Sequence, residues 1–189
     1  MIRKEFSVEL ESKTSHLGGH LNKTHVDLGS LKAINSLYGV NFMVDIGCGP
    51  GDMVREAQSM GIRAVGIDGD TSLADRWEGI PVIAHDFRKP FAWDGEYDLA
   101  WSVEFLEHVE EEYMENFLPI FCKAKYIMCT AAPPGTPGHH HVNCREKEYW
   151  IDIFESRGYT YDEEDTKYIK QLSTMRKPFI KNNGMFFRR

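Results

Sequence analysis

A glycine-rich stretch, Met43 to Gly51, places the strongest constraint on how this chain can fold. Val44 and Ile46 alternate with other residues, as in a strand that ends at the edge of a sheet. Three glycines at alternating positions follow, and such a loop lets a ligand approach the bare backbone. From Asp52 onward the apolar residues have helical spacing. This order of strand, loop and helix predicts the first crossover of a doubly wound sheet, where ligands bind beyond the carboxyl ends of the strands.

The charges around this loop favour a cationic ligand over a diphosphate. A dinucleotide fold uses G-x-G-x-x-G and seats its pyrophosphate on the helix N-terminus. Here Asp52 stands where the third glycine would be, and Asp45 lies just before the loop. Two carboxylates would repel a pyrophosphate but suit a ligand with an amino group and a sulfonium. A nicotinamide dehydrogenase is therefore the less favoured alternative.

Length and composition limit the remaining classes of protein. The 189 residues fit one domain, and 42% hydrophobic residues suffice for its core. A formal net charge of −7 gives no general attraction to nucleic acid. We expect no membrane span, no secretory signal and a cytoplasmic protein. The four cysteines form no C-x-x-C pair, so we expect reduced thiols.

The loop with its preceding Asp45 resembles the S-adenosylmethionine loop of class I methyltransferases. The resemblance covers roughly residues 40–189, which we take as the methyltransferase domain, after an arm and leading helix at 1–39. It implies an α/β fold with a doubly wound, seven-stranded, mostly parallel sheet whose last strand is antiparallel. Within the arm, Ser30 is the expected N-cap of a helix that ends at Gly39.

Acids at the ends of two later strands extend the resemblance. Asp68 lies about twenty residues beyond the loop, where an acid can accept hydrogen bonds from ribose hydroxyls, while Asp70 is expected to cap the next helix. In the family that the loop resembles, an acid after the third strand accepts from the adenine amino group and an apolar residue flanks the ring; Asp86 and Phe87 match that pattern. The predicted cofactor-binding residues are Asp45, Ile46, Gly47, Cys48, Gly49, Asp68, Gly69, Asp86, Phe87, Ser102 and Glu104.

The segment from Glu104 to Val109 resembles the signature that follows the fourth strand in small-molecule class I methyltransferases. If it turns helical at Glu104, then Glu104, Glu107 and His108 lie on one face. Two carboxylates and an imidazole could bind a divalent metal. The pattern is also similar to that of metal-dependent 2'-O-methyltransferases of small RNAs. We favour a wall of the cofactor pocket and predict no metal ligands, with the metal site as the alternative.

Histidines occur in the arm and in a loop after the fifth predicted strand. His16, His20 and His25 lie among glycines, either in a solvated arm or in a flap that closes over the cofactor. The run His139 to His141 follows a proline-rich turn, at the sheet edge where an acceptor would enter. Imidazole is a suitable general base near neutral pH. The predicted catalytic residues are His108, His140 and His141.

The sequence therefore predicts a methyltransferase that uses S-adenosylmethionine and methylates a small molecule on an oxygen, such as a sugar or metabolite hydroxyl. The expected partner is this small-molecule acceptor, with no membrane and no nucleic acid, and the oligomeric state stays open. Two alternatives remain: a metal-dependent RNA 2'-O-methyltransferase and a non-catalytic S-adenosylmethionine-binding protein.

Overall fold

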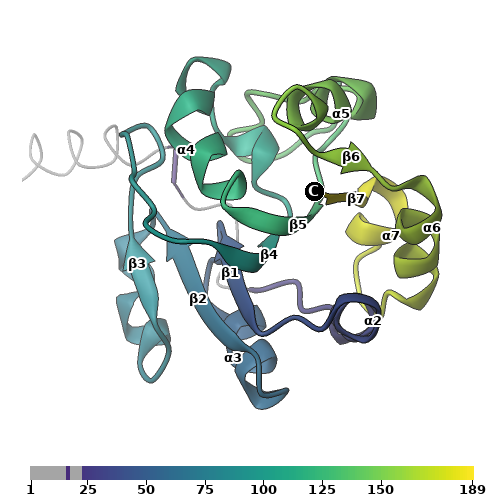
Figure 1. Cartoon of the computed structure of the whole chain (residues 1–189). Coiled ribbons are helices and arrows are strands. Elements are labelled where there is room, and N and C mark those ends of the chain that lie inside the picture. The colour runs from purple at the N-terminus through teal and green to yellow at the C-terminus, as the bar shows by residue number, and fades with distance from the viewer. Residues whose placement is uncertain (1–15, 18–22) are drawn as a thin grey trace, which may run out of the picture.

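A computed structural model describes His16, Leu17 and residues 23–189 of the chain (Figure 1). The prediction of a flap therefore lies partly outside the described residues, since it included Gly18, Gly19 and His20. The α-helices are α2 (Leu28–Tyr38), α3 (Asp52–Ser59), α4 (Met114–Phe121), α5 (Lys147–Glu155), α6 (Glu163–Leu172) and α7 (Phe179–Asn183). The strands are β1 (Phe42–Ile46), β2 (Arg63–Asp68), β3 (Val82–Ala84), β4 (Tyr97–Ser102), β5 (Ala124–Cys129), β6 (Thr160–Tyr161) and β7 (Met185–Arg188). The described residues also form three 3₁₀ helices: η1 (Thr71–Trp77), η2 (Leu106–His108) and η3 (Glu111–Tyr113).

The strands form one seven-stranded sheet in the order β3-β2-β1-β4-β5-β7-β6. The pairs from β3 to β5 are parallel, and Val44 in β1 lies between Val65 in β2 and Ala100 in β4. Strand β7 is antiparallel to both β5 and β6. This confirms the predicted fold, including the antiparallel last strand, and it brings the carboxyl ends of β1, β2 and β4 to one edge.

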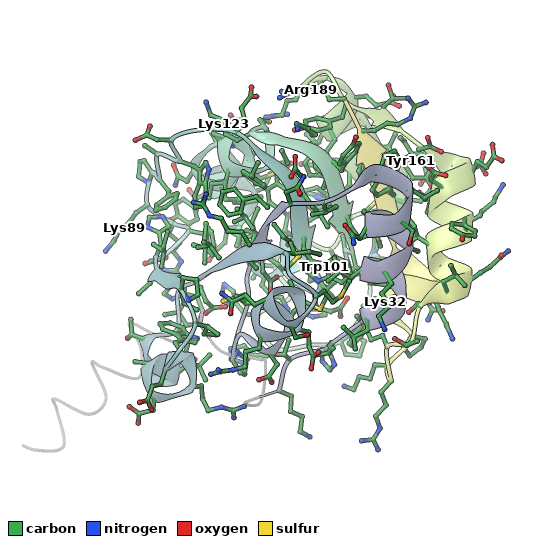
Figure 2. All side chains as sticks on the ribbon, turned by 60° about the horizontal axis from the view of Figure 1, so that its bottom comes forward. Lys32, Lys89, Trp101, Lys123, Tyr161 and Arg189 are labelled. Carbon is green, nitrogen blue, oxygen red and sulfur yellow. The ribbon has the colours of Figure 1, made fainter. Side chains whose placement is uncertain are left out.

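Two hydrophobic cores cover the two faces of the sheet. Helices α4 and α5 pack on one face, where Phe117 and Trp150 are fully buried. Helices α2, α3 and α6 contribute to the core on the other face, which also contains Trp101. In Figure 2, Trp101 lies in the interior, whereas Lys89 and Lys123 project from the periphery. Because both faces are covered, the edge with the strand ends is free to hold a ligand.

The start of α2 differs from the prediction. Asp27, not Ser30, is the N-cap, and its Oδ1 accepts a hydrogen bond of 3.0 Å from the Ser30 backbone N–H. The same carboxylate accepts from the Thr174 N–H at 2.9 Å and from the Ser173 hydroxyl. Asp27 is fully buried. An ionised carboxylate can accept several hydrogen bonds, so Asp27 can cap the helix N-terminus in place of the Ser30 hydroxyl. The same carboxylate also ties the arm to the loop after α6.

The end of the chain is only partly as predicted. Gly39 ends α2, as expected, and Asp162 caps α6. Strands β6 and β7 pair but do not form a tight hairpin, because α6 and α7 lie between them. Helix α7 was not predicted. The four cysteines are free thiols, as expected. Among the described helices, none combines the length and the apolar character needed to cross a bilayer.

Candidate functional site

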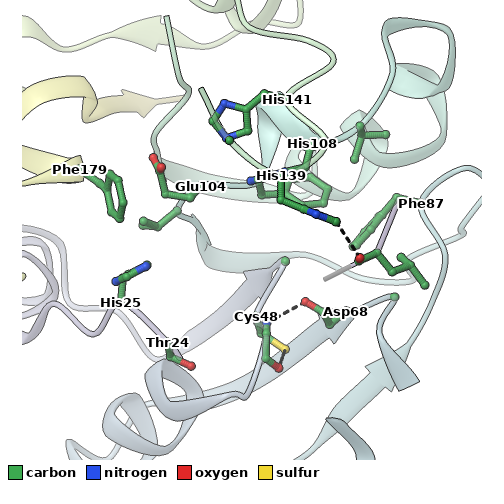
Figure 3. A pocket seen from close by; sticks show the side chains of 18 of the residues that line it. Thr24, His25, Cys48, Asp68, Phe87, Glu104, His108, His139, His141 and Phe179 are labelled. Carbon is green, nitrogen blue, oxygen red and sulfur yellow. Dashed lines mark hydrogen bonds between the residues drawn. The ribbon is translucent and has the colours of Figure 1, made fainter. Parts of the chain in front are cut away.

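A cavity of about 350 Å³ lies beyond the carboxyl ends of the parallel strands (Figure 3). Its walls come from the glycine loop, the segments after β2, β3 and β4, the histidine loop after β5, and residues near both α2 and α7. This volume lies within the usual range for small-molecule sites. The topology therefore brings most of the sequence motifs to one place.

The glycine loop forms one wall of the cavity with its backbone. Gly47 has a φ of 76°, and a Cβ added there would lie 2.6 Å from the Phe105 ring. A side chain is therefore excluded by both conformation and space. The Gly49 N–H donates a 2.7 Å hydrogen bond to Asp68 Oδ2, which fixes the loop against the end of β2.

Asp68, Asp86 and Phe87 line the cavity on the side of β2 and β3. Asp68 also accepts a hydrogen bond of 2.9 Å from the Asp70 N–H, while Asp70 caps η1 as predicted. His16 Nε2 lies 3.4 Å from Asp86 Oδ1, and Phe87 packs edge-to-face on Phe105 at 4.6 Å between ring centroids. These residues give this part of the cavity carboxylates and an aromatic wall, which suits a nucleoside.

Asp45 faces the same cavity from the end of β1 and is only 3% exposed. Burial, and then the neighbouring charge of Asp68, raise the pKa of Asp45 to about 8. A cationic group of a ligand would restore the ionised form of this carboxyl. Ile46 and Ser102 are buried outside the cavity lining, and the Ser102 hydroxyl donates to the Ile46 carbonyl at 2.9 Å. Both join β1 to β4 beneath the site.

The segment after β4 is not helical at Glu104, so the predicted single helical face is wrong. Glu104 has a φ of 55°, and its N–H donates to Thr130 Oγ1 at 2.8 Å. Thr130 Oγ1 donates in turn to Glu104 Oε1 at 3.1 Å. A left-handed conformation is uncommon outside glycine and costs free energy. Here Thr130 offsets that cost, because its hydroxyl binds both the backbone N–H and the side-chain carboxylate of Glu104. Burial raises the pKa of Glu104.

Glu107, His108 and His141 form a cluster at the far wall. One ligand atom from each lies within 4.8 Å of the others. Glu107 is fully buried, and neither of its side-chain oxygens accepts a hydrogen bond from the part of the chain that the structure describes. Burial and then Glu104 raise the pKa of Glu107 to about 8, whereas burial and then His141 lower the pKa of His108 to about 4.

The histidine loop reaches this cluster through backbone contacts. The Glu107 carbonyl accepts hydrogen bonds of 3.0 Å from the N–H groups of Val142 and Asn143. His141 then packs on His108 with ring centroids 4.9 Å apart. A Cβ at Gly138 would lie 2.1 Å from the His141 ring, so this position needs glycine to leave room for the imidazole.

The other two histidines of the run lie elsewhere. His139 lines the cavity, and its Nε2 is 3.0 Å from the Leu17 carbonyl of the arm. His140 is not part of the lining; it has a φ of 47° and pairs with Glu110 at 3.1 Å. The structure therefore brings His108 and His141 together and leaves His140 outside, where its predicted catalytic role stays a prediction.

Residues of the arm also line the cavity. They include His16 and His25, which the flap alternative would place over the cofactor, and Lys23 and Thr24 beside them. The described ends of the arm thus contribute to the cavity wall, and Thr24 Oγ1 accepts a 3.2 Å hydrogen bond from the Asp52 N–H at the start of α3. The other lining residues that the motifs did not indicate include Arg88, Trp101, Val103, Lys177 and Phe179.

Comparison with known proteins agrees with the fold and the motifs. Residues 44–120 match the family model of a methyltransferase domain. No curated protein matched the chain. A crystal structure of an S-adenosylmethionine-dependent methyltransferase from Archaeoglobus fulgidus is 23% identical, with 70% of this chain and 68% of that chain covered and a TM-score of 0.54.

Two further solved structures cover more of the chain. A TehB-like S-adenosylmethionine-dependent methyltransferase from Corynebacterium glutamicum is 17% identical, covering 85% of this chain and 87% of that chain, with a TM-score of 0.62. Magnesium protoporphyrin IX methyltransferase from Synechocystis, with S-adenosylhomocysteine bound, is 16% identical over 84% of this chain and 78% of that chain, with a TM-score of 0.58. At these identities the likeness concerns the fold.

Proposed function

We propose that this chain, a class I S-adenosylmethionine-dependent methyltransferase by its matching domain and its fold, methylates an oxygen of a small molecule, such as a sugar or metabolite hydroxyl. The single observation that carries the proposal is a cavity with two chemically different walls. Strand-end carboxylates line one side, and the paired imidazoles of His108 and His141 line the other.

The residues present fit the cofactor. Gly47 and Gly49 present bare backbone to the cavity, and the Phe105 ring packs against Gly47 where a Cβ would otherwise lie. Asp68, Asp86 and Phe87 line the cavity, and we assign Asp68 to the ribose diol and Asp86 with Phe87 to the adenine ring. Asp45 would hold the amino group, because a buried carboxyl gains most from a nearby cation. When bound, the cofactor supplies an electrophilic methyl group on a positively charged sulfur.

The imidazole pair supplies the base that an oxygen acceptor needs. The pKa of His108 is lowered to about 4, which makes its ring a weak base, so we assign proton acceptance to His141, whose ring packs on the neutral His108 ring with centroids 4.9 Å apart. General-base catalysis of this kind typically contributes about 10²–10⁴-fold. Alignment of the acceptor in the cavity can lower the barrier by a further ~7–11 kcal/mol.

Incubation with radiolabelled S-adenosylmethionine and fractionated cell extract tests the proposal, followed by identification of the labelled product. We expect His141→Ala to slow methyl transfer by about 10²-fold or more while S-adenosylhomocysteine still binds. His140→Ala is the matched comparison, since His140 adjoins His141 but lies outside the cavity lining. Full turnover by the His141→Ala enzyme would contradict a catalytic role for this histidine.

A metal-dependent RNA 2'-O-methyltransferase is the second candidate, and one observation favours it. Glu107, His108 and His141 offer three ligand atoms within 4.8 Å, and the buried Glu107 carboxyl lacks a hydrogen-bond partner in the described chain. Carboxylate and imidazole suit a divalent transition metal or magnesium. Such an ion would lower the pKa of a hydroxyl that it binds.

Metal dependence separates the two candidates. For the second candidate we expect manganese or magnesium to stimulate transfer, chelation to abolish it, and Glu107→Ala to remove the stimulation. Direct titration of manganese into the protein, with Glu107→Ala as control, gives a reading that does not need the acceptor. If chelator leaves turnover unchanged and small-molecule fractions carry the label, the metal-dependent candidate is wrong.

A further inference from the structure

The end of the cavity opposite Phe87 has a distinct composition. Figure 3 shows His25 and Phe179 together at that end, with Phe87 at the other and Glu104 between them. Lys23 and Lys177 line the same cavity, and both are exposed. This end is built from two segments far apart in the sequence, one before α2 and one at the start of α7.

An aromatic ring holds the basic groups of the two segments close together. The His25 ring packs edge-on against Phe179, with centroids 4.8 Å apart. Lys177 Nζ lies 5.5 Å from the centre of the same Phe179 ring. Both lysines act on His25: its pKa is lowered first by burial, then by Lys177 and then by Lys23. The two ammonium groups therefore favour the neutral form of the His25 ring, which keeps an N–H to donate.

The positive charge at this end is not balanced locally. Among residues 23–189 the ion pairs that form within 4.0 Å involve neither Lys23 nor Lys177. Glu104 lines the same cavity, and Lys177 opposes the rise in its pKa. Glu104 Oε1, however, accepts its hydrogen bond from Thr130.

From this arrangement we propose that Lys23, His25 and Lys177 form an anion subsite of the cavity, which takes a carboxylate or phosphate group of a bound small molecule. Two ammonium groups and one imidazole N–H supply charge and hydrogen bonds, and the Phe179 ring supplies a wall that positions them. The anion has two sources: the amino-acid end of the cofactor, or the methyl acceptor. The second source would make the acceptor an anionic metabolite. The assignment of these sources rests on the proposed methyl transfer, but the subsite itself does not.

The test compares Lys177→Gln with Lys181→Gln, an exposed lysine of α7 outside the cavity lining. Calorimetry measures binding of S-adenosylhomocysteine and of 5'-methylthioadenosine, which lacks the amino-acid end. If the anion belongs to the cofactor, Lys177→Gln weakens S-adenosylhomocysteine by about 10-fold and leaves 5'-methylthioadenosine unchanged.

The second arm adds inorganic phosphate to protein saturated with S-adenosylhomocysteine, against sodium chloride at equal ionic strength. If the anion belongs to the acceptor, phosphate raises the melting temperature of the wild type and of Lys181→Gln but not of Lys177→Gln. Lys23→Gln should show the same loss as Lys177→Gln, either in S-adenosylhomocysteine binding or in stabilisation by phosphate.

The proposal is overturned if Lys177→Gln matches the wild type in both arms. Absence of any nucleoside binding would contradict the proposed function instead. In that case the phosphate arm, run without nucleoside, still decides on the subsite: a stabilisation lost in Lys177→Gln supports it, and equal behaviour of the two proteins overturns it.

Discussion

Replacing Asp45 with asparagine should remove the pH dependence of cofactor binding. Asp45 faces the cavity, is nearly fully buried, and has a pKa of about 8 because of burial and Asp68. In the free protein at neutral pH most of this carboxyl is therefore protonated. A ligand ammonium group beside it favours the ionised form and lowers its pKa, so binding releases a proton.

The raised pKa of Asp45 sets both the direction and the size of the pH dependence of cofactor affinity. Because the free-state pKa is raised, affinity should increase with pH below about 8 and level off above it. At about pH 6 only roughly one molecule in 100 carries ionised Asp45, against about half at pH 8, so the apparent affinity should be about 50-fold lower at pH 6 than at pH 8, or ~2.3 kcal/mol at 1.36 kcal/mol per factor of ten. Near pH 8 the α-amino group of the ligand also begins to lose its proton, which adds to the levelling.

Calorimetry with S-adenosylhomocysteine in buffers of different ionisation enthalpy counts the protons released. We expect close to one proton for the wild type below neutral pH and none for Asp45→Asn, whose affinity should resemble that of the wild type at low pH. The control ligand 5'-methylthioadenosine has no amino group and should not show this increase. The reasoning fails if the two ligands share the same pH dependence, or if Asp45→Asn keeps it.

Three other substitutions test the framework of the site. In Gly66→Ala the new Cβ would lie 2.5 Å from Cys48 Sγ, so we expect a loss of about 1–3 kcal/mol in unfolding free energy and weaker S-adenosylhomocysteine binding, measured by urea titration and calorimetry. Glu104→Gly should be more stable than Glu104→Ala by about 1 kcal/mol in thermal unfolding, since both remove the carboxyl but only glycine relieves the φ of 55°; equal stability would contradict strain. Asp27→Ala should cost about 1–3 kcal/mol in urea unfolding, because it leaves the N–H groups of Ser30 and Thr174 without their acceptor.

The parts of the site that the sequence predicted are those with a local physical signal. A glycine loop between a strand and a helix, and acids at strand ends, depend on contacts within a short stretch. Asp45, Asp68 and Asp86 accordingly line one cavity, and their contact with the cofactor stays a prediction. Ile46 and Ser102 also lie at strand ends, but the alternation of side chains along a strand points them into the core and away from the cavity.

The remaining features depend on tertiary contacts. Which of three consecutive histidines faces the cavity depends on the backbone conformation of the loop. His140 has a positive φ and its ring pairs with Glu110, whereas the His141 ring contacts His108. Glu104 looked like the start of a helix, but its contact with Thr130 in a neighbouring segment holds it in a left-handed conformation. Lys177 lies in a stretch between helices with no motif and no periodicity, so no sequence signal indicated it.

The Asp27 carboxylate connects the two segments that carry Lys23 and Lys177, since it binds the start of α2 and the loop after α6. The polypeptide on either side of that junction forms one end of the binding chamber, while the glycine loop and the acids after β2 and β3 form the other. Residues at the first end can therefore diverge without altering the nucleoside cradle. If the anion held at the first end belongs to the acceptor, changes there alter the choice of substrate and leave the methyl donor in place.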